Sequence, residues 1–448
     1  MSDLLSIGAS GVRTYQGALT TVSGNIANAG VEGYARRSAT IAEIGAASGS
    51  YSSQVLSGLG SKVVGIARSG DGLKSAAVRT ASTDLARTES GGAWLDRIQS
   101  ALTGNQIGAR MTGFYGAATT LAADPTSSAA RTGLLESATT VAGSFQATGR
   151  AIDQIAADID ATADQATAAL NGFGRALAKV NDGLARVDPT SAAAASLGDQ
   201  RDQLLDQMSA LVDMTVTTDS VGRATVKLGD ASGPTFVSGT ESGYTTYARS
   251  AGNVSLTVFR AGLLSGVMPA GGALGGIVDG AARVADARKS LDEIATDFTT
   301  TVNAFQASGQ TLDGTAPGLK MFDVAPAAPT EIKLALTNPD GIAAASVGGG
   351  TRDGSNLAKL TETRASSKVE SRTIALVANN AAAIEQRKLV ADAQSAIRDG
   401  ALTARNAVTG VNLDSEAVDL LRFQQAYQAS SKVIQVARDI FQTIIGIN

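Results

Sequence analysis

The sequence predicts a mainly α-helical protein with a small inserted β domain: a long helical bundle, or coiled-coil rod, whose N- and C-termini pair at one end. Apolar residues recur at every seventh position near both ends of the chain and again in three long interior segments. Such a repeat places apolar side chains on one stripe of a helix, and the stripe needs a partner helix. One central segment instead alternates with a period of two, the pattern of β-strands.

Composition narrows the chemistry that the chain can perform. Its 448 residues include no cysteine and no histidine, and the formal net charge is −4. Disulfides, thiolate nucleophiles and histidine-dependent catalysis or metal binding are therefore excluded, whereas carboxylate or lysine catalysis is formally open. No Lys/Arg run and no apolar stretch of about 18 residues occurs. We expect a protein that is not an enzyme, with no cofactor, no metal, no nucleic-acid partner and no membrane partner.

The two terminal segments carry matching heptad repeats. Residues spaced by seven in the first segment are Leu5, Val12, Leu19 and Ile26. Their counterparts in the last segment are Leu413, Leu420, Tyr427, Ile434 and Phe441. Helices of roughly 22 to 32 residues with so narrow an apolar stripe are marginal alone in water. We therefore expect them to pair with each other, with further copies of the chain, or both.

The first helix is expected to stop at Asn28 and Gly30, since both residues tolerate left-handed backbone conformations. Residues 35–70 form an extended segment with strand-like pieces, and helices are predicted over 71–104 and from about 107 to 123.

The longest helical repeat runs from Phe145 to Val187 and ends at Asp188-Pro189. Three glycines weaken it, and they predict a bend: Gly172, Gly174 and Gly183. A shorter helix around Leu197 to Leu211 is expected to pack back on it.

Residues 213–260 alternate with period two between Gly, Asp and Ser turns, which predicts a small β domain. Helical repeats return from Ile277 to Phe305 and from Val369 to Ile397, and the last helix opens at Asn412 or Asp414. The expected units are a terminal coiled-coil region of 1–34 plus 405–448, an elongated helical bundle of 35–212 plus 262–404, and the β domain of 213–261.

Several motifs carry a family resemblance. Residues 23–28, Ser-Gly-Asn-Ile-Ala-Asn, followed by Gly-Tyr-Ala-Arg at 33–36, resemble the signature of the axial proteins of the bacterial flagellum. The C-terminal segment 411–437 is similar to the hook-associated protein 1 family, the hook–filament junction proteins. Three interior segments point to the same family: 199–206, 271–276 and 338–346. One departure is Gly24, where axial proteins commonly have a second asparagine.

The resemblance implies a structural adaptor that joins hook to filament, is exported through the flagellar type III channel without a cleaved signal peptide, and ends up extracellular. Its implied partners are further copies in a ring, the hook protein, the neighbouring hook-associated protein on the filament side, and a flagellar export chaperone. It also implies that the terminal helices are disordered in the monomer and order on assembly. The residues assigned to axial-helix packing and assembly are Leu5, Val12, Leu19, Asn25, Ile26, Asn28, Gly33, Tyr34, Leu413, Leu420, Phe423, Tyr427, Ile434 and Phe441.

Other interpretations remain open at this level. The terminal repeats also suit an ordinary intramolecular hairpin, and the 25–34 motif suits a simple helix stop and turn. The chain could be another axial subunit, of hook, rod or flagellin type, or a hydrolase that uses paired carboxylates. The glycine run at 271–276 lacks a Walker lysine, so it does not predict phosphate binding. Arg201 and its acidic neighbours Asp199, Asp202 and Asp206 are expected to form surface charge pairs along one helix.

Overall fold

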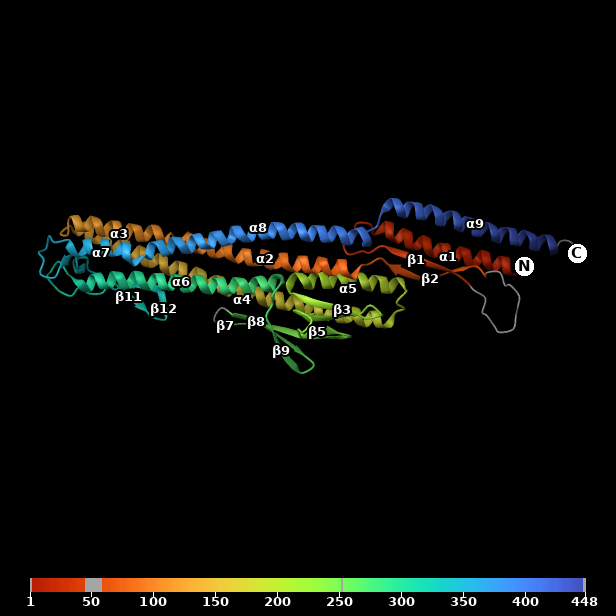
Figure 1. The fold of residues 1–448 in the computed structure, drawn as a ribbon, viewed down its shortest axis with the longest axis horizontal. Coiled ribbons are helices and arrows are strands. Elements are labelled where there is room, and N and C mark those ends of the chain that lie inside the picture. Colours follow the sequence, from red (N-terminus) through yellow and green to blue (C-terminus); the bar gives the residue numbers. More distant parts are fainter. Residues whose placement is uncertain (1, 45–58, 251–252, 446–448) are drawn as a thin grey trace.

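The protein is an elongated rod of long helices lying side by side, with both termini at the same end (Figure 1). The computed structural model describes residues 2–44, 59–250 and 253–445. Long helices dominate these residues, and the strands form small separate sheets. The predicted fold class is therefore confirmed.

The helices follow the predicted order. They are α1 Ser2–Ala27, α2 Gly72–Gly104, α3 Ile107–Ala123, α4 Ser128–Arg186, α5 Ala192–Leu211, α6 Gly272–Ser308, α7 Ser355–Ser367, α8 Val369–Thr409 and α9 Leu413–Ile445, with a short 3-10 helix at Pro339–Gly341. The strands are β1 Arg37–Glu43, β2 Ser61–Arg68, β3 Met214–Thr218, β4 Ala224–Leu228, β5 Thr235–Ser238, β6 Glu241–Ser242, β7 Tyr244–Ser250, β8 Asn253–Arg260, β9 Leu263–Val267, β10 Gly309–Gln310, β11 Phe322–Ala325, β12 Ala328–Leu334 and β13 Ala345–Ser346.

Side-chain caps fix where several helices begin. The Asp71 carboxylate accepts the backbone N–H of Leu73 at 2.9 Å and so starts α2. Asn412, rather than Asp414, caps α9, because its side-chain oxygen accepts the N–H of Asp414 at 3.0 Å. Such caps satisfy backbone donors that have no partner inside the helix.

Helix α4 continues for 59 residues without a break, about 88 Å at 1.5 Å per residue. The glycines at 172, 174 and 183 do not interrupt it. A Cβ on Gly174 would lie 2.7 Å from the Phe236 ring, and one on Gly183 would lie 3.1 Å from Leu197. These glycines therefore admit neighbouring elements close to the helix rather than weakening it.

The deepest part of the core lies at the end of the rod away from the termini, where α3, α4, α6 and β11 meet. Its aromatic side chains are Phe114, Tyr115, Phe145, Phe298 and Phe322, and all are buried. Phe298 packs against Phe114, Phe145 and Phe322 with ring centroids 5.5 to 5.9 Å apart. Contacts at these distances add to the stabilisation from apolar burial. This aromatic packing therefore stabilises the end of the rod opposite the terminal helices.

The glycine run at 271–276 serves helix packing. A Cβ on Gly276 would lie 2.6 Å from the Arg87 carbonyl oxygen, and one on Gly280 would lie 2.4 Å from Trp94. Gly272 has φ +68°, a left-handed conformation that favours glycine. The run therefore lets α6 approach the backbone of α2 closely.

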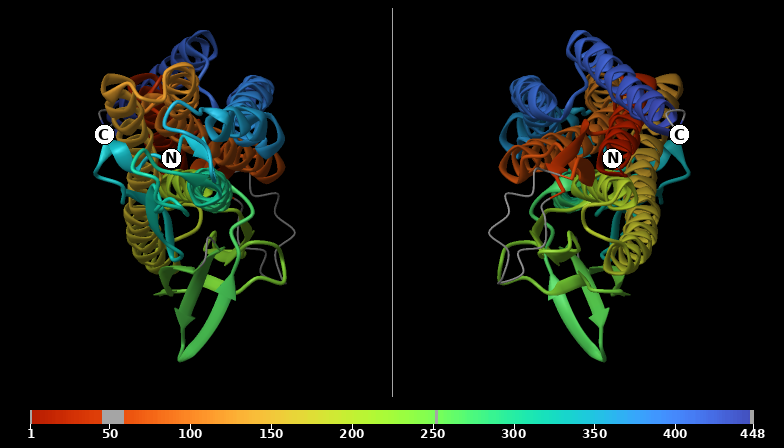
Figure 2. Two further views of the ribbon diagram at one scale, coloured as in Figure 1. Left: turned by 90° about the vertical axis from the view of Figure 1, so that its left-hand side faces the viewer. Right: turned by 90° about the vertical axis from the view of Figure 1, so that its right-hand side faces the viewer.

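The β module consists of two sheets: one of four strands in the order β3-β4-β5-β6, and one of three strands in the order β7-β8-β9. Its last strand ends at Val267, beyond the expected boundary at 261. The module projects from the side of the rod (Figure 2). By contrast, β1 and β2 form a separate antiparallel pair that lies beside α1 and also contacts α5 of the bundle.

Because Gly276 packs closely against α2, we expect the Gly276→Ala substitution to destabilise the protein. The added methyl would collide with the α2 backbone, and we expect a loss of about 1–3 kcal/mol in the free energy of unfolding. Gly116 in α3 has open space around its Cβ position. Gly116→Ala should therefore stabilise the protein by up to about 1 kcal/mol. Urea unfolding of both variants checks this, and a neutral Gly276→Ala would contradict the packing argument.

A second prediction concerns Asp279, which joins three helices by bonding Arg387 of α8 at 2.7 Å and Arg87 of α2 at 3.1 Å. Burial alone would raise the pKa of Asp279, but the hydrogen bonds and charges of both arginines outweigh it and hold the pKa below its ordinary value. The carboxylate therefore stabilises the fold above about pH 4 and loses this contribution as the pH falls through the lowered pKa. Unfolding measured against pH should show a shallower acid decline for Asp279→Asn, and a parallel decline would contradict this.

Candidate functional site: the paired terminal helices

Helices α1 and α9 lie antiparallel along the terminal end of the rod (Figure 1). The antiparallel order follows from their contacts: Gly8 approaches Ile434, Tyr15 stacks near Phe423, and Asn25 bonds Glu416. The first and last segments of the chain are therefore joined over most of their length, as the matching repeats predicted.

The face of α1 that is buried is made of small residues. Its buried positions recur at heptad-like spacing and are Gly8, Gly11, Thr14, Ala18, Val22 and Asn25; we call them the inner seam. A Cβ on Gly8 would lie 2.7 Å from Ile434, and one on Gly11 would lie 2.5 Å from the Ser430 hydroxyl. The Thr14 hydroxyl donates to the Ser61 carbonyl of β2 at 2.8 Å. Small side chains thus let α9 and β2 approach α1 from two sides.

The predicted stripe of α1 is a different face. Val12, Leu19 and Ile26 are only half-buried, and Leu5 is 47% exposed. On α9, the half-buried members are Leu420, Phe423, Tyr427 and Ile434. Leu413 and Phe441 are each 54% exposed. The chain therefore covers the heptad residues only in part.

Helix α9 also carries an uncovered apolar face, which we call the outer stripe: Val418, Leu421, Val433, Val436 and Ile440. These residues are all exposed and recur at spacings that keep them on one side of the helix. Its second half borders an apolar groove that Leu4 of α1 also lines. An exposed face of this kind is characteristic of an interaction surface.

A buried polar cluster closes the other end of the helix pair. Glu416 is fully buried and accepts hydrogen bonds from the Asn25 amide at 2.8 Å and from Arg36 at 2.6 Å. The Asn25 amide also donates to the Arg37 carbonyl at 2.7 Å, while its oxygen accepts the Arg37 N–H at 3.0 Å. Tyr34 donates its hydroxyl to the same Asn25 oxygen at 2.8 Å. These bonds join α1, the start of β1, and α9.

Burial raises the pKa of the Tyr34 hydroxyl; the nearby Asp199 and Glu416 act in the same direction, while Arg37 opposes them. Tyr34 therefore stays protonated and able to donate its hydrogen bond to Asn25 near neutral pH. Its ring lies 5.0 Å from the Arg37 guanidinium, a favourable cation–π contact.

Asn28 and Gly33 shape the turn after α1. The Asn28 amide donates to the Gly24 carbonyl at 2.8 Å, within the predicted helix stop. Gly33 has φ +80°, and a Cβ there would lie 2.5 Å from Gln203 of α5. Gln203 in turn donates to the Glu32 carbonyl at 2.9 Å. The turn is thus held against the bundle.

The acidic motif of α5 binds arginines far away in the sequence. Asp199 accepts from Arg37 at 2.9 Å and from Arg68 at 2.6 Å. Asp206 accepts from Arg405 near the end of α8 at 2.6 Å. Arg201 and Asp202 do pair along α5, at 2.7 Å, as expected, but Asp199 and Asp206 bind arginines of other elements. The Asp199 bridges tie α5 of the bundle to β1 and β2, which with α1 and α9 form the terminal unit, and the Asp206 bridge joins α5 to α8.

Sequence reasoning missed Glu416 and assigned no role to Arg36. Arg36 stood inside the quoted Gly-Tyr-Ala-Arg motif, and Glu416 lies in the first turn of the last helix. Only their spatial juxtaposition reveals the pair. Asn25 and Tyr34 were assigned to assembly; the structure uses their polar side-chain atoms within the chain, and their part in assembly stays a prediction.

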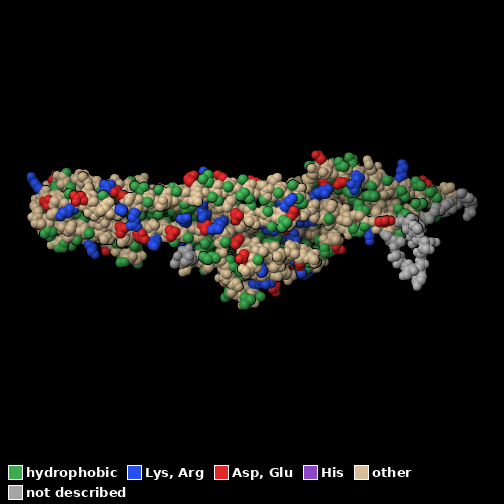
Figure 3. All heavy atoms as spheres, viewed as in Figure 1, with side chains coloured by type: hydrophobic (Ala, Val, Ile, Leu, Met, Phe, Trp, Pro, Cys, Tyr) green, Lys and Arg blue, Asp and Glu red, His purple; other side chains and the backbone are tan. Residues whose placement is uncertain are grey.

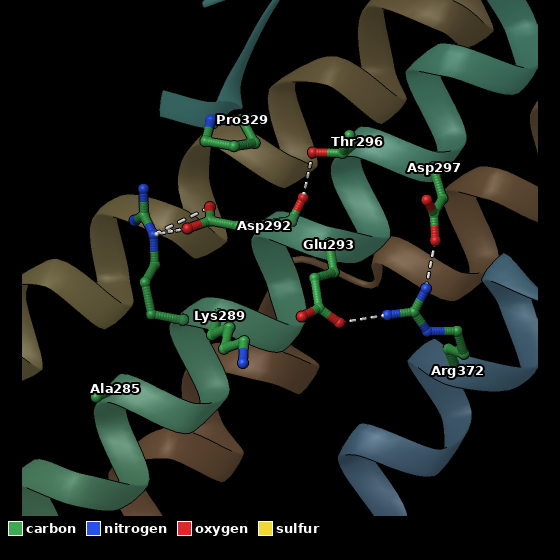
Figure 4. Close-up of a pocket in the computed structure, with 9 residues that line it drawn as sticks. Ala285, Lys289, Asp292, Glu293, Thr296, Asp297, Pro329 and Arg372 are labelled. Atoms are coloured by element: carbon green, nitrogen blue, oxygen red, sulfur yellow. Dashed lines mark hydrogen bonds and ion pairs between the residues drawn. The ribbon is translucent and has the colours of Figure 1, made fainter. Parts of the chain in front are cut away.

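A second groove, on the surface of α6, gathers the carboxylates of Asp292, Glu293 and Asp297 (Figure 4). Glu293 and Asp297 both bond Arg372 of α8. Asp292 pairs with Arg288, and burial raises the pKa of its carboxyl. The acids thus pair with two separate arginines. No cluster of three potential metal ligands, and no helix able to span a membrane, occurs within the described ranges.

Matches to two family models define the class of this protein as flagellar structural proteins. The family model described as flagellar basal body rod FlgEFG protein C-terminal matches residues 406–447, which include α9. The model of the flagellar hook-associated protein FlgK helical domain matches residues 94–322, just over half of the chain. The chain therefore belongs to the FlgK family of flagellar hook-associated proteins, and the resemblance found in its motifs is confirmed.

Individual relatives agree. Flagellar hook-associated protein 1 of Salmonella typhimurium is 27% identical over 243 residues, covering 53% of this chain and 43% of that protein. The Escherichia coli protein of the same name is 26% identical over 247 residues, covering 53% and 44%. The chain thus matches less than half the length of these relatives. The flagellar hook junction protein FlgK of Burkholderia pseudomallei shares the fold, with a TM-score of 0.66 at 14% identity, covering 74% of this chain and all of that one.

The buried cluster predicts that Arg36→Met loosens the start of α9. Removing one partner of a buried charge pair costs about 3–5 kcal/mol, because Glu416 would remain buried without its cation. We expect amide hydrogen exchange in residues 413–420 to accelerate, while exchange in α3 and α6 stays unchanged.

The matched control is Arg422→Met, because Arg422 is a largely exposed arginine of α9 itself. It should leave exchange near wild type. Equal effects of the two substitutions would contradict the role given to Arg36.

Proposed function

We propose that this chain is the adaptor that joins the flagellar hook to the filament, and that it assembles through α1 and α9. The observation that carries the proposal is the outer stripe of α9, an apolar face left uncovered beside a helix pair that is closed along its inner seam. A helix of this kind gains apolar burial when further copies cover it. The relatives' names, hook-associated protein 1 and hook junction protein, support the same role.

In this proposal the fourteen residues assigned to assembly fall into three groups. Leu5, Leu413 and Phe441 are exposed and contact neighbouring copies. Asn25, Tyr34 and Gly33 shape the terminal unit from within. The remaining eight are half-buried in the single chain: Val12, Leu19, Ile26, Asn28, Leu420, Phe423, Tyr427 and Ile434.

The proposed partners are further copies in a ring, the hook protein, the next hook-associated protein on the filament side, and an export chaperone before secretion. The protein acts outside the cell, reaches that place without a cleaved signal peptide, and performs no catalysis. Disorder of the terminal helices before assembly belongs to the same proposal. A seam of small residues buries little apolar area, so the helix pair of a lone chain is weakly stabilised.

Another axial subunit, such as a rod or hook protein, is the second candidate, favoured by the rod-protein match at residues 406–447. The FlgK helical-domain match over 94–322 favours the junction adaptor. Deleting the gene in the parent bacterium separates the two. We expect hooks without filaments, whereas loss of the hook itself would support the second candidate.

The outer stripe predicts the effect of Val436→Asp. Val436 is exposed in the single chain, so its thermal unfolding should stay near wild type, but a charge within an apolar contact between copies should abolish filament attachment. Leu319→Asp, at an exposed position in the 309–322 segment, is the control and should retain filaments. Electron microscopy of flagella checks both, and motile, filament-bearing cells with Val436→Asp would refute the proposal.

A further inference from the structure

One uncharged surface lies on the β module. In the sheet β7-β8-β9, Tyr244, Phe259 and Leu264 stand directly opposite one another across the three strands. All three are exposed, and Leu264 is 72% exposed. The next row on this face is Thr246, Thr257 and Gly266. We call these six residues the β face; it contains no charge.

The opposite side of the same sheet is the buried one. Thr245, Leu256 and Val258 are buried, and β7 and β8 pack against α4 and α6. The alternation of buried and exposed residues therefore leaves the β face pointing away from the rod. Hydrophobic side chains gather at the lower tip of the module (Figure 3).

A second uncharged surface runs along α8. Its members are Ala382, Leu389, Val390, Ala393, Ala396 and Ile397, and we call them the α8 stripe. All are exposed; Leu389 is 71% and Ile397 is 63% exposed. The spacing of three, four and seven residues keeps them on one side of the helix. The heptad members Val390 and Ile397 thus face solvent rather than the bundle.

The two surfaces occupy opposite sides of the rod. α8 runs along its upper edge, and the β module hangs below the level of α8 (Figure 1). The end-on views also place α8 and the β7–β9 sheet on different sides of the bundle (Figure 2). One chain therefore cannot cover its own α8 stripe with its own β face.

Charges at the edges of the two surfaces are complementary. Arg175 of α4 lines the same groove as Tyr244 and Thr246, and Lys179 follows it one turn later. Both are exposed and have no ion pair within the described residues. Asp164 lines this groove too, so two cations and one carboxylate border the β face, which leaves a net positive edge. Beside the α8 stripe, Glu385 and Asp392 lie one turn either side of Leu389, with Lys388 between them. All three are exposed and have no ion pair within the described residues, so this edge carries a net negative charge.

We infer that the β face of one copy packs on the α8 stripe of the next copy. The inference rests on the proposed function, in which copies surround a common axis. Contact between two α8 stripes would bring the carboxylates of Glu385 and Asp392 near those of the other copy. Contact between two β faces would bring the cations Arg175 and Lys179 near those of the other copy. Both arrangements place like charges together. Contact between unlike surfaces pairs opposite charges instead. Such a heterologous contact closes into a ring when its rotation is right.

Cross-linking tests the contact, because the chain has no cysteine of its own. Purified Leu264→Cys and Ile397→Cys chains are mixed and treated with a short bifunctional maleimide. We expect mixed dimers, and a ladder of oligomers when both cysteines are in one chain. Leu319→Cys is the control for random collision. Dimers formed by Leu264→Cys alone, or mixed dimers no more abundant than with the control, would overturn the inference.

A charge exchange supplies the second readout. Lys179→Glu and Asp392→Lys should each lower the yield of mixed cross-links about two- to fivefold at low salt. Placing Lys179→Glu in the Leu264→Cys chain and Asp392→Lys in the Ile397→Cys chain should restore it. No loss with the single changes, or no restoration by the pair, would count against the contact.

The same cysteine chains, expressed as the sole copy in the parent bacterium, separate this inference from the proposed function. Filament-bearing flagella without the Leu264–Ile397 cross-link would overturn the contact and leave the adaptor role standing. Absence of the chain from flagella would instead contradict the adaptor role. In that case the cross-linking of the purified chains would be the remaining test of the contact.

Discussion

The antiparallel pairing of α1 with α9 is the constraint on which the rest of the structure depends. It brings residue 8 beside residue 434 and so requires every intervening segment to leave the terminal unit and return to it. The long helices of the bundle extend away from the terminal helices and return to them. The aromatic core around Phe298 packs these helices together at the far end. The β module is inserted between α5 and α6, where it widens the rod without interrupting it.

The pairing is close because α1 contributes small residues to it. Gly8 and Gly11 let α9 approach, but such a seam removes little apolar surface from water. Specificity comes instead from the buried Glu416, which needs both Asn25 and Arg36 to satisfy it. The larger apolar side chains are left for other contacts. A subunit with one closed and one open face suits assembly, because its second face is complete only among other copies.

Periodicity predicted the helices well, because heptads and turn residues are local signals. It could not decide which face of α1 the chain itself would bury, since α1 carries both the Leu5 stripe and a seam of small residues. Nor could it show that Gly276 serves contact with α2, or that Asp199 binds Arg37 across more than a hundred residues. These outcomes depend on which elements meet in space. Motif resemblance supplied the family, but not the roles of individual residues.

Thiol reactivity on the outer stripe tests the central claim most directly. A cysteine replacing Leu421 should react with a maleimide at the rate of an exposed thiol in the free chain and become protected in isolated flagella. A cysteine replacing Ala118, which is buried in the bundle core, should react slowly in both states. If Leu421→Cys were equally reactive before and after assembly, the open face would have no partner, and the account of how this chain assembles would be wrong.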